Sequence, residues 1–330
     1  MKNLRKPAFS NNLTSKIRKI FRRRLTGDDA FKLLTMSFAS SIFILLGLMI
    51  YELVRGSALS IQKFGINFLT GTKWDPAISQ VFGAFPLILG TLVTSAIALL
   101  IGVPISLGIG LALSEYAPRR FGIVISFLVE LLAAIPSVIY GLWGIFILIP
   151  FLRNNVYLGL QGILGFVPLF PGPIYGGGVL TSGIILAIMI IPTVSAISRD
   201  VFSAVPNAQR EAVISLGATK WETAKTVMSY ARAGVISAII LGLGRAIGET
   251  MAVTMVIGNK FQVLPGSLFD GWYTMAAIIA NEFTEATYDL YVNSLVEVGL
   301  VLFFIALLIN VLARLIVWRA LRLVRGIARE

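Results

Sequence analysis

The sequence contains no cysteine and no histidine, and only 13% of its 330 residues are charged. Without cysteine, the chain can form neither disulfides nor thiolate sites. Without histidine, it lacks the commonest metal ligand and the side chain that usually transfers protons near neutral pH. These absences argue against most classes of enzyme.

The chain is unusually apolar, with 57% hydrophobic residues and a mean hydropathy of +0.86. Soluble globular proteins have about 45–50% apolar and about 25% charged residues. A membrane-spanning helix needs about 20 predominantly apolar residues. We therefore predict an all-α, polytopic membrane protein with six transmembrane helices, at Phe31–Val54, Phe82–Leu113, Phe121–Phe151, Gly178–Phe202, Ala233–Ile257 and Val292–Trp318.

The second and third predicted spans are long enough to tilt or bend, and prolines within them favour kinks. The prolines are Pro86, Pro104, Pro136 and Pro150. We expect the chain to bend near these residues and at nearby glycines during a transport cycle. The positions we select are Gly102, Pro104, Pro136, Gly244 and Gly248.

Lysine and arginine are distributed unevenly between the loops, which predicts the orientation in the membrane. If both termini are cytoplasmic, 22 of the 28 basic residues lie inside and five outside. The residues before the first span are polar and basic, without a signal-peptide pattern, so that span stays as an anchor. We expect a cytoplasmic segment 1–30, a span 31–54, an extracytoplasmic loop 55–81, a core 82–320 with a cytoplasmic loop 203–232, and a tail 321–330.

A net charge of +12 and the basic run RKIFRRRL (Arg18–Leu25) raise the possibility of nucleic-acid binding. Membrane topology already explains these residues, and no recognisable nucleic-acid-binding module accompanies them. Attraction to anionic lipid headgroups is the better secondary role for this run. We therefore expect membrane lipids, and no nucleic acid, among the partners.

The largest predicted cytoplasmic loop contains REAVISLGATKWETAKTVMSYARAGV (Arg210–Val235). Ala212 and Leu216 give it an apolar edge, and helix-forming residues flank Gly217 on both sides. This pattern predicts a short helix, a tight turn and a second helix that leads into the fifth span. Such an element can receive movement from a cytoplasmic partner, although an ordinary amphipathic connector has a similar pattern.

Glu211-Ala212, with Gly217 six residues after the glutamate, resembles the EAA loop of ATP-binding-cassette importer permeases, which docks into the ATPase subunit. The third position is Val213 instead of alanine, and the closing I-x-L-P appears as VMSY (Val227–Tyr230). Five further segments, in order between about residues 30 and 318, resemble phosphate-specific permeases of the PstC kind. They are FLTGTKWDP, GTLVTSAIALLIGVPISLGIGLALSEYAP, ELLAAIPSVIYGLWG, IIPTVSAISRDVFSAVP and GLGRAIGETMAVTMVIGN.

This resemblance implies a type I importer permease with the MetI-like fold, which is a transporter subunit and no enzyme. It also implies three kinds of partner: a PstA-like permease, two copies of a cytoplasmic ATP-binding subunit, and an extracytoplasmic phosphate-binding protein. The residues expected to contact the ATPase are Glu211, Ala212, Leu216, Gly217 and Trp221. The sequence has no G-x-x-x-x-G-K-[ST] motif, so we expect no cofactor here and ATP on the partner.

The segment GLGRAIGETMAV (Gly242–Val253) places Arg245 and Glu249 four residues apart in the fifth predicted span. In a helix that starts at Ala233, the two share one face, and Arg245 lies roughly 18 Å along the axis. A charge at such depth costs about 2.5–3.5 kcal/mol and must face protein or water.

Two interpretations of this pair stay open. The pair could be an internal ion pair, with Gly244 and Gly248 forming a small-residue helix contact. Alternatively, the guanidinium binds an oxyanion and the carboxylate keeps that binding weak enough for release. We favour the second interpretation. Glu130 and Glu297 are weaker candidates, because either could reach a membrane interface.

Other function classes fit the sequence less well. A secondary transporter normally shows inverted repeats, and we find no convincing repeat among the six spans. A membrane enzyme would depend on Glu249, Glu130 and hydroxyls such as that of Thr250. The chain alone does not distinguish phosphate from a similar oxyanion, because selectivity also depends on the second permease and the binding protein.

Overall fold

The computed structural model describes residues 27–327. The basic segment up to residue 26 and residues 328–330 lie outside the described residues. The chain divides into two units, Met1–Glu52 and Leu53–Glu330. The described part of the first unit belongs to one helix, α2 (Gly27–Gly56), which begins with Asp28 and Asp29 in its first turn, where acidic side chains favour the helix dipole.

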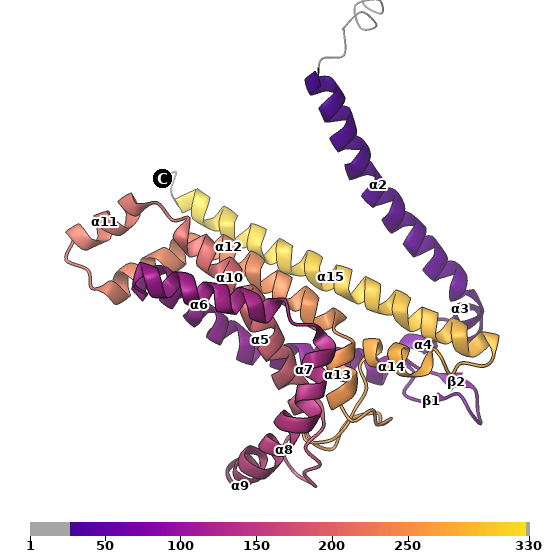
Figure 1. Ribbon diagram of the computed structural model, residues 1–330. Helices are drawn as coiled ribbons and strands as arrows, with labels where there is room; N and C mark the ends of the chain where they lie inside the picture. Colours follow the sequence, from indigo (N-terminus) through magenta and orange to yellow (C-terminus); the bar gives the residue numbers. More distant parts are fainter. Residues whose placement is uncertain (1–26, 328–330) are drawn as a thin grey trace, which may run out of the picture. The chain divides into compact units, whose positions relative to one another are not determined.

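Six helical segments within residues 27–327 are long and apolar enough to cross a membrane (Figure 1). The prediction of an all-α protein with six spans is therefore confirmed, apart from one pair of two-residue strands. The segments are Gly27–Gly56, Phe85–Tyr116, Ser137–Leu164, Val179–Ser203, Lys220–Gly248 and Asp289–Leu315.

Helix α10 (Val179–Ser203) is the central helix of the second unit. In its most apolar stretch 61% of the residues are buried, against 33% in α12 (Lys220–Gly248). It packs against α12 and α5 (Phe85–Leu111), and glycines allow close approach on both sides. A Cβ added at Gly102 of α5 would lie 2.9 Å from the side chain of Ile190. Gly102 therefore has a packing role, and its role in bending stays a prediction.

The third span differs from the prediction of one helix over Phe121–Phe151. Helix α6 (Arg119–Ala133) ends before Pro136, whose backbone is extended, and a second run of helix follows up to Leu164. The break at Pro136 agrees with the predicted bend. The run consists of α7 (Ser137–Trp143), η2 (Gly144–Leu148), α8 (Ile149–Phe151), η3 (Leu152–Tyr157) and α9 (Leu158–Leu164).

The fifth span also differs from the prediction. Helix α12 begins at Lys220 instead of Ala233, because Thr219 and Glu222 form a capping box in which each side chain binds the other residue's backbone N–H. It ends at Gly248, well before the predicted end at Ile257. A short helix, α13 (Met251–Val256), continues the chain after an interruption at Glu249 and Thr250.

The end of the unit at which α15 begins is built from short elements. They are α3 (Ala58–Phe64), α4 (Asn67–Thr70), the antiparallel strands β1 (Trp74–Asp75) and β2 (Val81–Phe82) and α14 (Met275–Glu282), and the long helix α15 (Asp289–Ile327) starts beside them. A half-buried carboxylate joins β1, α14 and α15, since Glu282 accepts hydrogen bonds from Trp74 Nε1 (2.8 Å) and Tyr291 Oη (2.6 Å). In Figure 1, α14 and the strands lie at the opposite end of this unit from α11 (Asn207–Ser215).

Candidate functional site: the coupling loop and the broken fifth span

The predicted cytoplasmic loop folds as the expected helix, turn and helix. Helix α11 (Asn207–Ser215) is followed by its C-cap residue Leu216 and then by Gly217, which has a φ of +83°. Only glycine adopts this left-handed conformation without strain, so Gly217 forms the tight turn before α12. Glu211 and Ala212, the first two residues of the segment that resembles the EAA loop, lie on α11 and are exposed.

Three large apolar side chains around this turn are exposed: Ile214 at 57%, Leu216 at 88% and Trp221 at 61%. We call these three residues the coupling patch. Leu216 and Trp221 were predicted from the sequence, whereas Ile214 was missed. Glu211 beside them forms no hydrogen bond or ion pair with any residue between 27 and 327. Apolar side chains grouped on a polar segment are typical of a surface that binds another protein.

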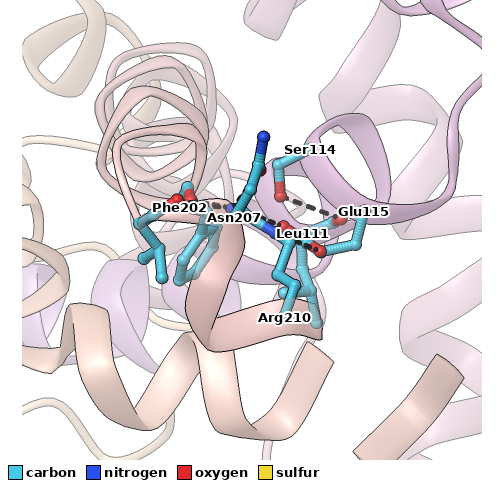
Figure 2. Close-up of polar contacts among 7 residues, drawn as sticks. Leu111, Ser114, Glu115, Phe202, Asn207 and Arg210 are labelled. Atoms are coloured by element: carbon cyan, nitrogen blue, oxygen red, sulfur yellow. Dashed lines mark hydrogen bonds and ion pairs between the residues drawn. The ribbon is translucent and has the colours of Figure 1, made fainter. Parts of the chain in front are cut away.

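Arg210, directly before Glu211, anchors α11 to the ends of two spans (Figure 2). Its Nη2 and Nε donate to the two carboxylate oxygens of Glu115, at 2.8 and 3.1 Å. Glu115 belongs to η1 (Ala112–Tyr116), which continues α5. The same guanidinium donates to the carbonyl of Phe202 (2.8 Å) and to that of Val205, at the end of α10.

This ion pair is largely shielded from solvent, because the Arg210 and Glu115 side chains are 17% and 10% exposed. The hydrogen bonds that Arg210 donates to the Glu115 carboxylate raise the pKa of Arg210, so the guanidinium stays charged. A bidentate pair fixes orientation as well as distance. The coupling loop therefore cannot move far without moving the end of α5, the end of α10, or both.

Arg245 and Glu249 are separated by the end of α12. Arg245 lies in the last helical turn, but Glu249 has an extended backbone with a ψ of 126°. The prediction that they share a helix face is therefore wrong, because the helix ends at Gly248. No ion pair joins them in the described chain.

Each of the two side chains has another contact. Arg245 Nη1 donates to the hydroxyl of Thr193 on α10 at 3.0 Å, and the residue is half-buried. The Glu249 carboxylate accepts from the backbone N–H of Ala252, in the first turn of α13, at 3.4 Å. Across residues 27–327, no carboxylate neutralises the guanidinium of Arg245.

Gly244 and Gly248 lie on either side of Arg245 and face open space. A Cβ added to either residue would meet nothing within 4 Å in the described chain. The alternative in which these glycines pack against a neighbouring helix of the same chain is therefore wrong. Their open surface lies next to an arginine without a carboxylate partner, so a second molecule or an aqueous path can reach this region.

Glu130, a weaker candidate from the sequence, is in an ion pair. Arg199 Nη2 lies 3.2 Å from Glu130 and 2.8 Å from Asp200. Glu130 and Arg199 line an open cavity of about 640 Å³ between α6, η1 and α10, which includes Ser114 and Ser126 in its lining. Arg199 is already neutralised by two acids, so it is a poorer anion ligand than Arg245.

Comparison with known proteins shows the family. Residues 102–322 match the model for "Binding-protein-dependent transport system inner membrane component". The chain belongs to this family. The matched residues include the coupling patch, Arg210, Arg245 and the break after α12, so all of these lie in the part of the chain that defines a binding-protein-dependent transport component.

Several curated relatives resemble the chain over almost its whole length. A phosphate transport system permease protein PstC from Mesorhizobium japonicum is 46% identical, over 90% of this chain and 92% of the relative. The Haemophilus influenzae PstC is 45% identical, over 92% and 97%. A probable PstC from Methanocaldococcus jannaschii is 36% identical, over 91% and 95%. The resemblance that the sequence motifs indicated is confirmed.

Proposed function

We propose that the chain is the permease subunit of an ATP-driven phosphate importer and forms half of its transmembrane pathway. The observation that carries this proposal is the 36–46% identity to PstC permeases over about 90% of the chain. The six spans of a multi-pass membrane protein and the exposed coupling loop are consistent with it. A permease for another oxyanion is the alternative, and competition between anions distinguishes the two.

Arg245 is the residue that we assign to the anion pathway. Its guanidinium keeps a neutral hydroxyl partner, so its charge is available to a phosphate, whose oxygens match the planar donors of arginine. Interrupted helices commonly line transport sites, because backbone groups freed at the break face a cavity. Glu249 at the same break limits the residence of the anion by its negative charge, without forming the predicted ion pair.

The remaining members of the complex follow from the same proposal. A PstA-like permease covers the open face at Gly244 and Gly248, and an extracytoplasmic protein delivers phosphate. Two cytoplasmic ATP-binding subunits hydrolyse ATP, and one of them binds the coupling patch. Both termini of the chain are cytoplasmic, in agreement with the distribution of lysine and arginine. The chain itself needs no cofactor.

The decisive experiment is ATP-dependent phosphate uptake into vesicles that contain the complete complex. We expect Arg245→Gln to reduce uptake at least tenfold, since a hydrogen bond to a charged group contributes about 1.5–3 kcal/mol. Thr193→Val, which removes only the hydroxyl partner, should reduce it less. ATP-dependent uptake of another oxyanion by the wild type, with no uptake of phosphate, would identify a different substrate.

A further inference from the structure

A groove along α15 has no place in the proposed phosphate pathway. It encloses about 460 Å³ between α15, the segment around Gly65 to Leu69 and the first turn of α5. The walls are apolar and include Leu300, Phe304 and Leu308. Among the described residues that line it, Glu297 alone has a polar side chain. The groove therefore combines one carboxyl group with an otherwise hydrocarbon-like surface.

Glu297 is buried and incompletely bonded. The residue is 6% exposed, and its Oε2 has no hydrogen-bond partner in the described chain. Buried polar atoms almost always have partners, and buried charges are normally paired. The free oxygen therefore indicates a hydrogen-bond donor that is supplied by another molecule.

The groove has a polar end and an apolar end. Glu297 lies eight residues after the start of α15 at Asp289, whereas Leu308 lies 11 residues further into the span. At 1.5 Å per residue, the lining between them extends for about 16 Å along the helix axis. Phe304 and Leu308 are 49% and 57% exposed, so the apolar end is open at the side of the span.

We propose that this groove binds one aminophospholipid of the leaflet at which α15 begins. The primary ammonium of the headgroup donates to Glu297, and one acyl chain lies along Leu300, Phe304 and Leu308. A carboxylate repels anionic headgroups, and no lysine or arginine is among the described lining residues. A choline headgroup has no N–H with which to satisfy the free oxygen, whereas a primary ammonium has three.

A lipid fits this groove better than a helix of another protein. A protein partner would have to place a lysine or a similar donor opposite Glu297 within the membrane, where such residues are rare because of their desolvation. An aminophospholipid carries its ammonium at the interface and its hydrocarbon in the span. This order matches the order of carboxyl group and apolar wall along α15.

Native mass spectrometry of the full chain, purified with its partners in mild detergent, tests the proposal. The probes are phosphatidylethanolamine, phosphatidylcholine and phosphatidylglycerol with identical acyl chains. We expect phosphatidylethanolamine to be retained about tenfold better than the other two, as one charge-assisted hydrogen bond allows. Glu297→Gln should remove this preference, whereas Glu285→Gln, an exposed acid outside the groove, should preserve it.

A second measurement applies even if Glu297→Gln fails to fold. Leu308→Trp adds bulk at the open end and should lower retention of phosphatidylethanolamine with Glu297 intact. A photoreactive residue at Phe304 should crosslink to lipid in the assembled complex. Equal retention of the three lipids, unchanged retention in Leu308→Trp, or a crosslink to a polypeptide would each overturn the proposal.

Discussion

At the scale of single residues, the pair Arg210–Glu115 gives the sharpest expectation. Glu115→Gln leaves a charged guanidinium, only 17% exposed in the folded chain, without its bidentate carboxylate. Loss of one partner of a shielded, hydrogen-bonded ion pair costs about 1–3 kcal/mol. We expect a lower Tm in detergent, together with ATP hydrolysis that is poorly coupled to uptake. Thermal unfolding and the ratio of ATP hydrolysed to phosphate imported measure the two effects.

The pair Arg199–Asp200, in which the acid is exposed, provides the control for this prediction. Asp200 is 68% exposed, and such surface pairs contribute about 0–1 kcal/mol. Asp200→Asn should therefore change neither the Tm nor the coupling ratio appreciably. If Glu115→Gln lowers the Tm but leaves the coupling ratio unchanged, the ion pair only stabilises the fold and transmits no movement.

Glu282 supports a prediction about pH. Burial raises the pKa of this carboxyl group, while hydrogen bonds from Tyr291 and Trp74 oppose that shift. An acid whose pKa is higher in the folded state stabilises the fold when protonated, and this contribution is lost as the pH rises through the folded pKa. The Tm of the wild type relative to Glu282→Gln should therefore rise as the pH falls from 7 to 5. The opposite slope would show that the fold prefers the carboxylate.

At the scale of helices, the glycines of α5 and α12 should respond differently to alanine. A Cβ at Gly90 would lie 2.0 Å from the backbone carbonyl oxygen of Tyr273, which cannot move aside cheaply, so Gly90→Ala should destabilise the chain by about 1–3 kcal/mol. Gly244→Ala and Gly248→Ala meet no atom of residues 27–327 and should not lower the Tm of the chain. Thermal unfolding of the three variants checks this difference.

The glycines of α12 also test the assembly. If a second permease covers Gly244 and Gly248, larger substitutions such as Gly248→Leu should reduce copurification of that subunit without lowering the Tm of this chain. Normal copurification and normal uptake with Gly248→Leu would instead place this surface away from both the partner and the pathway.

The same helices show which features the sequence can reveal. Apolar runs predict six spans, and the residues around Gly217 predict a helix, turn and helix, because both patterns are local. The boundaries of two spans were wrong for different reasons. The proline at position 136 predicted a bend, but hydropathy does not show that the helix ends there. The capping pair Thr219 and Glu222, which the sequence does contain, was overlooked.

The site depends on contacts that no local pattern contains. Glu249 follows Arg245 by four residues, which predicts a shared face only if the helix continues. The helix ends at Gly248, but the apolar pattern of the sequence does not change there. Arg210 and Glu115 are 95 residues apart in the chain, so their pairing follows from the packing of α5, α10 and α11. The sequence does place opposite charges after the ends of two predicted spans, and from this the pairing of Arg210 with Glu115 could have been proposed.

At the scale of the whole molecule, the coupling patch should bind the ATP-binding subunit, whereas the opposite end of the second unit should not. Leu216→Asp places a charge on a side chain that is 88% exposed, so it leaves the fold intact but disrupts an apolar contact. Ile78 is 89% exposed between β1 and β2, and Ile78→Asp is a control of matched exposure and chemistry.

We expect Leu216→Asp to reduce copurification of the ATP-binding subunit about tenfold or more, because one buried leucine contributes roughly 1.5–3 kcal/mol. Ile78→Asp should leave that copurification unchanged. Equal effects of the two variants would mean that Leu216 acts through solubility and lies outside the interface with the ATPase.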